Sequence, residues 1–212
     1  MEFRRTANAG GLLKLDGITI LLDGVSRQVG SYLATPPREK KLLSDCWPDV
    51  LAFTHCHKDH YDPDFAALYE KQTNGVILGP EDLPGCKTIQ EPVQMRGVKI
   101  IPVKSRHIGK AGQTVSHSSF LIEGTKRVLF LGDASPLQWK RIELPKLDVV
   151  FIPYAYAITP SAWQITKNFA AEKTVLLHMP DRQNDPDGLW DAVSAVVDTE
   201  ILTPEMGCNY LL

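Results

Sequence analysis

The sequence predicts an α/β protein, and three observations support that prediction. Short apolar runs, typical of buried strands, alternate with stretches whose apolar residues recur at helical spacing. Several apolar runs end on a histidine or an aspartate, which is typical of a site held by a rigid sheet. The 212 residues are 43% hydrophobic and 23% charged, which suits one globular domain over residues 1–212.

The first half of the chain is expected to contain strands and one helix. A helix is predicted at "PDFAALYEKQ", because Asp62 can cap its N-terminus and Pro63 can occupy its first turn. Residues 24–48 show no clear periodicity. The strands are predicted at "GLLKLDG", "ITILLDG", "DVLAFT" and "GVILGP".

The second half continues the alternation. A hairpin is expected where "SSFLIEG" and "KRVLFLGD" turn at Gly124 and Thr125. Helices are predicted at "TPSAWQITKNFAAE", with Thr159 as its cap, and at "DPDGLWDAVSAVV". The remaining strands are predicted at "GVKIIPV", "LDVVFIP", "KTVLLHMP" and "TEILTP".

Composition excludes several classes of partner. A formal charge of −2 gives no electrostatic footprint for nucleic acid or for an anionic membrane. No apolar run has the length needed to span a bilayer, and Asp16 and Asp23 interrupt the N-terminal apolar stretch, so we expect neither membrane insertion nor a signal peptide. The four cysteines are scattered, which favours a cytoplasmic location over a disulfide framework.

The stretch "THCHKDHYD" places three of the six histidines within the six positions from His55 to His60. Imidazole and carboxylate groups are the usual zinc ligands of catalytic sites. His55 and His57 are two residues apart, so in an extended segment both side chains can reach one ion. Asp59 and His60 are adjacent, so the chain must turn before both can face a second ion.

Three later residues, each after an apolar run, complete this set. His107 is expected to be the third ligand of the first ion, and His178 is expected to complete the second. Asp133 is placed to bridge the two ions, and the arrangement leaves an open coordination position, as catalytic zinc requires. Two ions about 3.5–4 Å apart can hold both oxygens of a hydrolysis, and a water between them can become the hydroxide nucleophile.

With these residues in place, the sequence resembles the metallo-β-lactamase superfamily. "THCHKDH" matches the HxHxDH signature of that superfamily, and His107, Asp133 and His178 follow in the same order along nearly the whole chain. The resemblance implies an αββα four-layer sandwich, in which helices flank two mixed β-sheets and a dinuclear metal site lies at one edge. It also implies that Asp23 supports the site from outside the ligand set, whereas Ala134 stands where a threonine is often found.

The resemblance points to one branch of the superfamily and implies the same ligands that the residue types suggest. "DHYD" and the short chain look most similar to the branch that includes L-ascorbate-6-phosphate lactonase and N-acyl-phosphatidylethanolamine phospholipase D. The implied ligands are His55, His57 and His107 for one ion, Asp59, His60 and His178 for the other, and Asp133 between them.

The expected function is a metal-dependent hydrolase that acts on an ester, lactone or phosphoester bond of a small molecule. Asp59 is the candidate proton shuttle, because a carboxylate near the hydroxide can orient it and later deliver its proton. Two Zn²⁺ ions suit the donor set, although Mn²⁺, Fe²⁺ and Ni²⁺ bind similar ligands. Two alternatives stay open: a mononuclear iron oxidoreductase similar to persulfide dioxygenases, and a non-catalytic metal-binding module. A homo-oligomer is equally open.

Four further residues are candidates for support or substrate contact. For His117, which begins a predicted strand, substrate contact and a structural hydrogen bond are both open. Lys58 and Arg106 neighbour ligands, so they can meet an anionic substrate or point to solvent. Tyr154 follows a predicted strand and either lines the pocket or packs in the core.

Overall fold

The computed structural model describes residues 1–109, 114–197 and 201–212. Its first sheet has the strand order β13-β1-β2-β3-β4-β5 and contains both antiparallel and parallel pairs. The strands of this sheet are β1 (Glu2–Arg5), β2 (Gly11–Leu15), β3 (Ile18–Leu22), β4 (Val50–Ala52), β5 (Val76–Leu78) and β13 (Asn209–Leu211).

The second sheet has the order β12-β11-β10-β9-β8-β7-β6 and is also mixed. The expected hairpin is present as β8 and β9, which pair antiparallel. The strands are β6 (Val93–Met95), β7 (Val98–Arg106), β8 (Ser116–Glu123), β9 (Arg127–Phe130), β10 (Val149–Pro153), β11 (Lys173–Leu177) and β12 (Ile201–Leu202).

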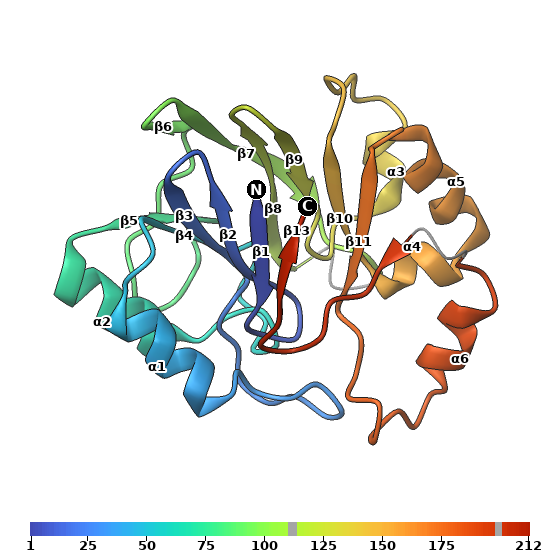
Figure 1. Ribbon diagram of the computed structural model, residues 1–212, viewed down its shortest axis with the longest axis horizontal. Coiled ribbons are helices and arrows are strands. Elements are labelled where there is room, and N and C mark those ends of the chain that lie inside the picture. The colour runs from blue at the N-terminus through green and yellow to red at the C-terminus, as the bar shows by residue number, and fades with distance from the viewer. Residues whose placement is uncertain (110–113, 198–200) are drawn as a thin grey trace.

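Helices cover the outer face of each sheet (Figure 1). On the first sheet lie α1 (Pro37–Asp45) and α2 (Pro63–Thr73), and on the second lie α3 (Pro136–Trp139), α4 (Tyr154–Ile158), α5 (Pro160–Asn168) and α6 (Leu189–Ser194). The expected αββα four-layer sandwich with two mixed sheets is therefore confirmed. No helix in the described parts of the chain is both long and apolar enough to cross a membrane.

The core consists of three apolar layers, which follow from the burial of each element. Between the sheets the side chains are almost fully buried, and the rings of Phe3 and Phe151 meet across the interface with centroids 4.7 Å apart. A second layer joins the first sheet to its helices through Phe65 and Tyr69. The third joins the second sheet to its helices and includes Trp139. Burial of this apolar surface is the main force that holds the sheets together.

Elements missing from the predictions owe their burial to tertiary partners. The helix α1 begins inside the polar string "TPPREKK", and its buried residues are Glu39 and Leu43, so its apolar periodicity is weak. The strand β1 carries Arg4, whose guanidinium forms an ion pair at 2.8 Å with the buried Glu39. A distinctive apolar pattern is missing from the sequences of β1, β13, β6 and α4. The ion pair between Arg4 and Glu39, which sequence periodicity does not reveal, joins β1 to α1.

The caps of two helices differ from expectation. Thr159 occupies the N-cap position of α5, but its side chain makes no capping hydrogen bond. The helix α6 begins only at Leu189, because Gly188 has a left-handed φ of 63° and the Asp185 carboxylate accepts from the backbone N–H groups that follow. Of the predicted strand "TEILTP", Thr199 and Glu200 lie outside the described residues.

Candidate metal centre

The histidine-rich loop lies between β4 and α2, at the carboxyl end of the strand. The backbone turns there, because the N–H groups of His60 and Tyr61 both donate to the carbonyl of His57 at 3.0 and 2.9 Å. The chain then enters α2, whose first turn is capped by the Asp62 carboxylate accepting from the N–H of Asp64 at 3.2 Å. This turn brings Asp59 and His60 to the same region as His57, as the spacing requires.

The other predicted ligands reach the same rim from the second sheet. His107 follows β7, Asp133 follows β9 and His178 follows β11. Among the described residues, ligand atoms within 4.8 Å of one another form three groups. The groups are His55, His57 and His107; His55, His60 and Asp133; and Asp59, His60 and His178. All seven predicted ligands are therefore brought together, in the two triads expected for two ions.

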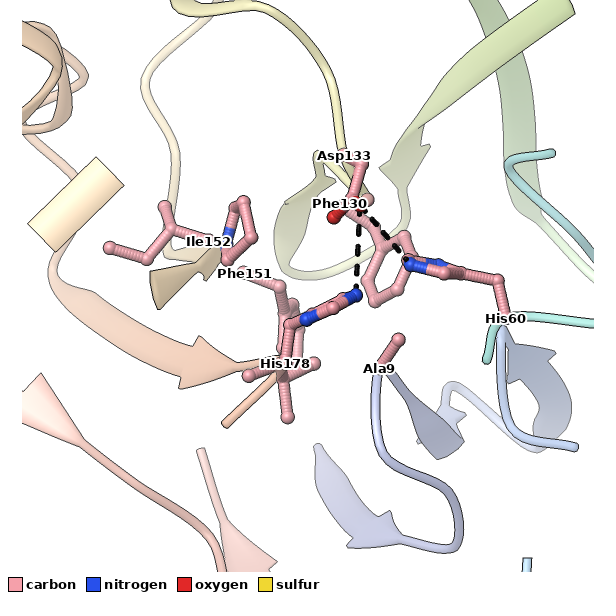
Figure 2. A pocket seen from close by; sticks show the side chains of 10 residues that line it. Ala9, His60, Phe130, Asp133, Phe151, Ile152 and His178 are labelled. Carbon is pink, nitrogen blue, oxygen red and sulfur yellow. Dashed lines mark ion pairs between the residues drawn. The ribbon is translucent and has the colours of Figure 1, made fainter. Parts of the chain in front are cut away.

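Asp133 lies between the two triads. Its Oδ2 is 3.4 Å from Nε2 of His60, 3.6 Å from Nε2 of His178 and 3.7 Å from Nε2 of His107. Figure 2 shows His60 and His178 pointing toward this carboxylate from opposite sides of a small pocket. This is the position that a bridging ligand requires.

The ring nitrogens of the centre fit a metal ion. Within the described chain, Nε2 of His55, of His60 and of His107 is buried without a hydrogen-bond partner. A buried polar atom without a partner is costly, whereas a cation would satisfy several of these atoms at once. The set of imidazole and carboxylate donors also matches the ligands of catalytic zinc.

Hydrogen bonds fix the tautomers of three of these histidines. The Thr54 hydroxyl donates to Asp23 at 2.6 Å, so the contact of 2.9 Å with His55 leaves the Nδ1–H of His55 as the donor. His60 donates from Nδ1 to Asp23 at 2.8 Å. His107 donates from Nδ1 to the carbonyl of Ile108 at 2.7 Å. In each case Nε2 is the ring nitrogen left to face a metal ion, which is how metal-binding histidines are commonly held.

The charges of the centre also favour a cation. Burial alone would raise the pKa of Asp133, but the adjacent His178 and His60 hold it well below 3.8, so the carboxylate is ionised. Burial, together with the positive charge of His60, holds the pKa of His55 well below 6.5, so His55 is neutral. Burial alone would lower the pKa of His60, but Asp133 and Asp23 hold it well above 6.5, so His60 carries a proton that a divalent ion would have to displace.

Asp23, just after β3, holds the histidine-rich loop in place. Its Oδ1 accepts from the backbone N–H of Thr54 at 2.7 Å and its Oδ2 from His60, while its side chain is fully buried. Its φ of 43° lies in the left-handed region, which aspartate tolerates better than most residues. Asp23 therefore orients a candidate ligand without being one, as the resemblance implied.

The remaining candidates lie at varying distances from the centre. His117 is buried, is absent from the ligand groups, and bonds to the Ser105 hydroxyl at 2.6 Å while its ring stacks on His55. Lys58 and Arg106 are exposed, and neither forms an ion pair with the centre in the described chain. Tyr154 lies against His178, with ring centroids 5.8 Å apart.

Tyr32 is a site residue that the sequence predictions missed. Its ring meets that of His178 edge-on at 4.7 Å, closer than the ring of Tyr154. Burial and the neighbouring Tyr154 hydroxyl raise the pKa of Tyr32, so its phenol is neutral and can donate a hydrogen bond. Tyr32 comes from the stretch without periodicity, and no pattern in the sequence marks it.

Comparison with known proteins identifies the fold. No family model and no curated protein matches the chain. An isothiocyanate hydrolase from Delia radicum gut bacteria is 15% identical, with a TM-score of 0.70 over 100% of this chain and 99% of that one. A possible metal-dependent hydrolase from Veillonella parvula is 16% identical, with a TM-score of 0.74 over 100% and 99%. The metallo-β-lactamase fold protein YhfI from Bacillus subtilis is 16% identical, with a TM-score of 0.60 over 97% and 92%.

These likenesses show that the chain has the metallo-β-lactamase fold. At such low identity a shared fold does not carry over an activity or a substrate. The chemistry of this chain must therefore be argued from its own side chains.

Proposed function

We propose that the protein is a metal-dependent hydrolase that acts on an ester, lactone or phosphoester bond of a small molecule. The observation that carries the proposal is the overlap of the ligand groups. His55 and His60 each belong to two of the three groups, and Asp133 lies between the outer triads. Such an overlap suits two ions held side by side, and we assign them as zinc on the donor types.

Bound ions would polarise the scissile bond and make a water nucleophilic near neutral pH. The residues of the chain have separate tasks in this scheme. Asp133 supplies negative charge between the triads, and Asp23 and Thr54 keep His60 and His55 in the ligating tautomer.

Asp59 is the proposed proton carrier. Its Oδ2 lies 3.1 Å from Nε2 of His178, and 14% of its side-chain surface is exposed. This exposed part of the carboxylate can exchange a proton with a bound water or substrate. Burial opposes ionisation, but the hydrogen bond from His178 lowers the pKa of Asp59 to about 2. The ionised carboxylate can accept a proton from the attacking water and deliver it to the leaving group.

Metal content per chain tests this proposal directly. We expect about two equivalents of zinc or manganese, by plasma mass spectrometry, in protein purified without chelators or a histidine tag. His57→Ala and Asp133→Ala should each lower that content. The loaded protein would then be screened on lactones, phosphodiesters and, because one structural neighbour is named an isothiocyanate hydrolase, isothiocyanates. Absence of metal from every preparation would overturn the proposal.

A second candidate rests on the composition of one triad. Asp59, His60 and His178 form a set of two histidines and one carboxylate, which is the set that non-haem Fe(II) oxygenases use. About one equivalent of iron in the same assay would favour the mononuclear iron oxidoreductase. A loaded centre that turns over no substrate would favour the non-catalytic metal-binding module. Kinship with the lactonase and phospholipase branch remains a prediction.

A further inference from the structure

A cavity of about 430 Å³ lies beside the candidate metal centre. Three chain segments place one residue at the centre and the next in the cavity. Ala9 lines the same small pocket as His60 and His178 (Figure 2), whereas Asn8 lines the cavity. Likewise Tyr32 contacts His178 and Leu33 lines the cavity, and Met179, next to His178, lines it too. The two spaces therefore lie on either side of these three segments.

Arg5 forms the buried floor of this cavity. It is 8% exposed, and its guanidinium donates to four backbone carbonyls, those of Ala7, Asn8, Met179 and Pro204. Among the described residues, no carboxylate lies within ion-pair distance of it. Burial lowers the pKa of Arg5 to about 10, which reflects how strongly its charge is desolvated. Buried charges are almost always paired, but Asp181, which interacts favourably with the charge of Arg5, lies beyond ion-pair distance.

Asn8 adds a second unsatisfied donor to the same floor. Its side chain is 3% exposed, and its Nδ2 has no hydrogen-bond partner within the described chain. Its backbone carbonyl accepts from both Arg5 and the N–H of His178, which fixes its position between cavity and metal centre. An amide donor without a partner and a cation without an ion-pair partner, on two residues that line one cavity, call for an acceptor with negative charge.

The walls and the rim have a different character from the floor. Arg182 packs on the ring of Trp190, 3.8 Å from its centroid. The carboxylates of Asp181 and Glu205 lie at the more exposed rim. The apolar wall residues are Leu33, Ala34, Pro36, Met179, Pro180, Trp190, Pro204 and Met206. The volume lies within the range of about 300–1,000 Å³ that is typical of small-molecule sites.

We propose that this cavity binds an organic carboxylate with an apolar body, whose carboxylate oxygens accept from Arg5 and Asn8. Binding in the cavity itself needs no metal.

The test uses 4-phenylbutyrate and its uncharged amide, 4-phenylbutyramide, as probes. Each is titrated calorimetrically into the full chain as purified, and into the chain stripped with 1,10-phenanthroline and dialysed. We expect the carboxylate to bind about tenfold or more tightly than the amide in both forms. Equal affinity of the two probes, or no binding of either, overturns the proposal.

Two variants locate the binding. Asn8→Asp puts a negative charge on the floor and should weaken carboxylate binding about tenfold or more. Asn184→Asp makes the same change on an exposed residue outside the cavity lining and should leave the affinity unchanged. Should Asn8→Asp fail to fold, Met206→Trp fills the cavity from its rim and should abolish binding.

Failure of this inference is distinguishable from failure of the proposed function. A probe that binds only the metal-loaded chain, and binds Asn8→Asp as well as wild type, is a metal ligand and overturns the cavity proposal. A chain that contains no metal but discriminates the two probes retains the cavity proposal and refutes the hydrolase.

Discussion

Nδ1 of His60 lies 2.8 Å from Oδ2 of Asp23, and both side chains are buried. The carboxylate accepts the Nδ1 proton, so Nε2 is the ring nitrogen of His60 that points toward the centre. Because Asp23 also accepts two hydrogen bonds from Thr54, one buried aspartate orients the candidate ligands of both triads.

We therefore expect Asp23→Asn to lower metal affinity about ten- to a hundredfold. The amide NH₂ can donate to Nδ1, which moves the ring proton to Nε2 and removes the ligating lone pair. Asparagine also tolerates the φ of 43° at this position, so the fold should be retained. Competition with a metal-binding dye measures the affinity, and an unchanged value would show that the tautomer of His60 does not matter.

Acid stability should depend on Asp62. Burial raises the pKa of this carboxyl, but ion pairs with Lys40 at 2.6 Å and Arg27 at 3.0 Å more than offset it and hold the pKa below 3.8. A lowered folded-state pKa contributes stability that is present above 3.8 and is lost as the pH falls through the folded value.

The matched variant is Asp62→Asn, which keeps a side-chain cap for α2 but removes the charge. Urea unfolding should show a smaller free energy of unfolding for the variant at pH 6. Below pH 4 the variant should lose less of this free energy than wild type does, because it has one titrating group fewer. Curves of unfolding free energy against pH that run parallel for the two proteins would contradict the prediction.

The backbone at Gly132 holds Asp133 in place. Gly132 has a φ of 55°, and a Cβ there would lie 2.5 Å from Cγ2 of Thr54. Gly132→Ala should therefore destabilise the protein and also displace the neighbouring Asp133, which lowers metal content.

Gly30 provides the control, because its φ of 56° is nearly the same but a Cβ would meet nothing within 4 Å. Gly30→Ala should cost only the backbone strain, about 1–2 kcal/mol, whereas Gly132→Ala should cost about 1–3 kcal/mol more. Denaturant unfolding measures both, and equal costs would show that the contact with Thr54 relaxes.

His117 should affect stability and leave the metal in place. It is buried, bonds to Ser105 and stacks on His55, but belongs to none of the ligand groups in the described chain. His117→Ala should cost about 1–3 kcal/mol of unfolding free energy with metal content unchanged. His107→Ala makes the same change at a candidate ligand and should lower metal content. Loss of metal from His117→Ala would add His117 to the ligands.

Much of the fold was predictable because local sequence patterns indicate the strands, turns and helix ends. The paired strands β8 and β9, and the helix α2 behind Asp62 and Pro63, follow from apolar runs, turns and caps. The opposite holds for α1 and β1. Half-buried Arg4 and buried Glu39 are far apart in the sequence and pair with each other, and no local pattern records such a partner.

The sequence by itself determined the α/β alternation and the chemistry of the centre. Closely spaced donors such as His55 and His57, and single donors at strand ends, can be recognised because residue type and strand position are local properties. Only the tertiary structure decided what surrounds that centre. Tyr32 reaches His178, and Arg5 and Asn8 line a cavity with Trp190, because loops remote in sequence converge there. Such convergence depends on how the two sheets pack, which no single segment of the chain specifies.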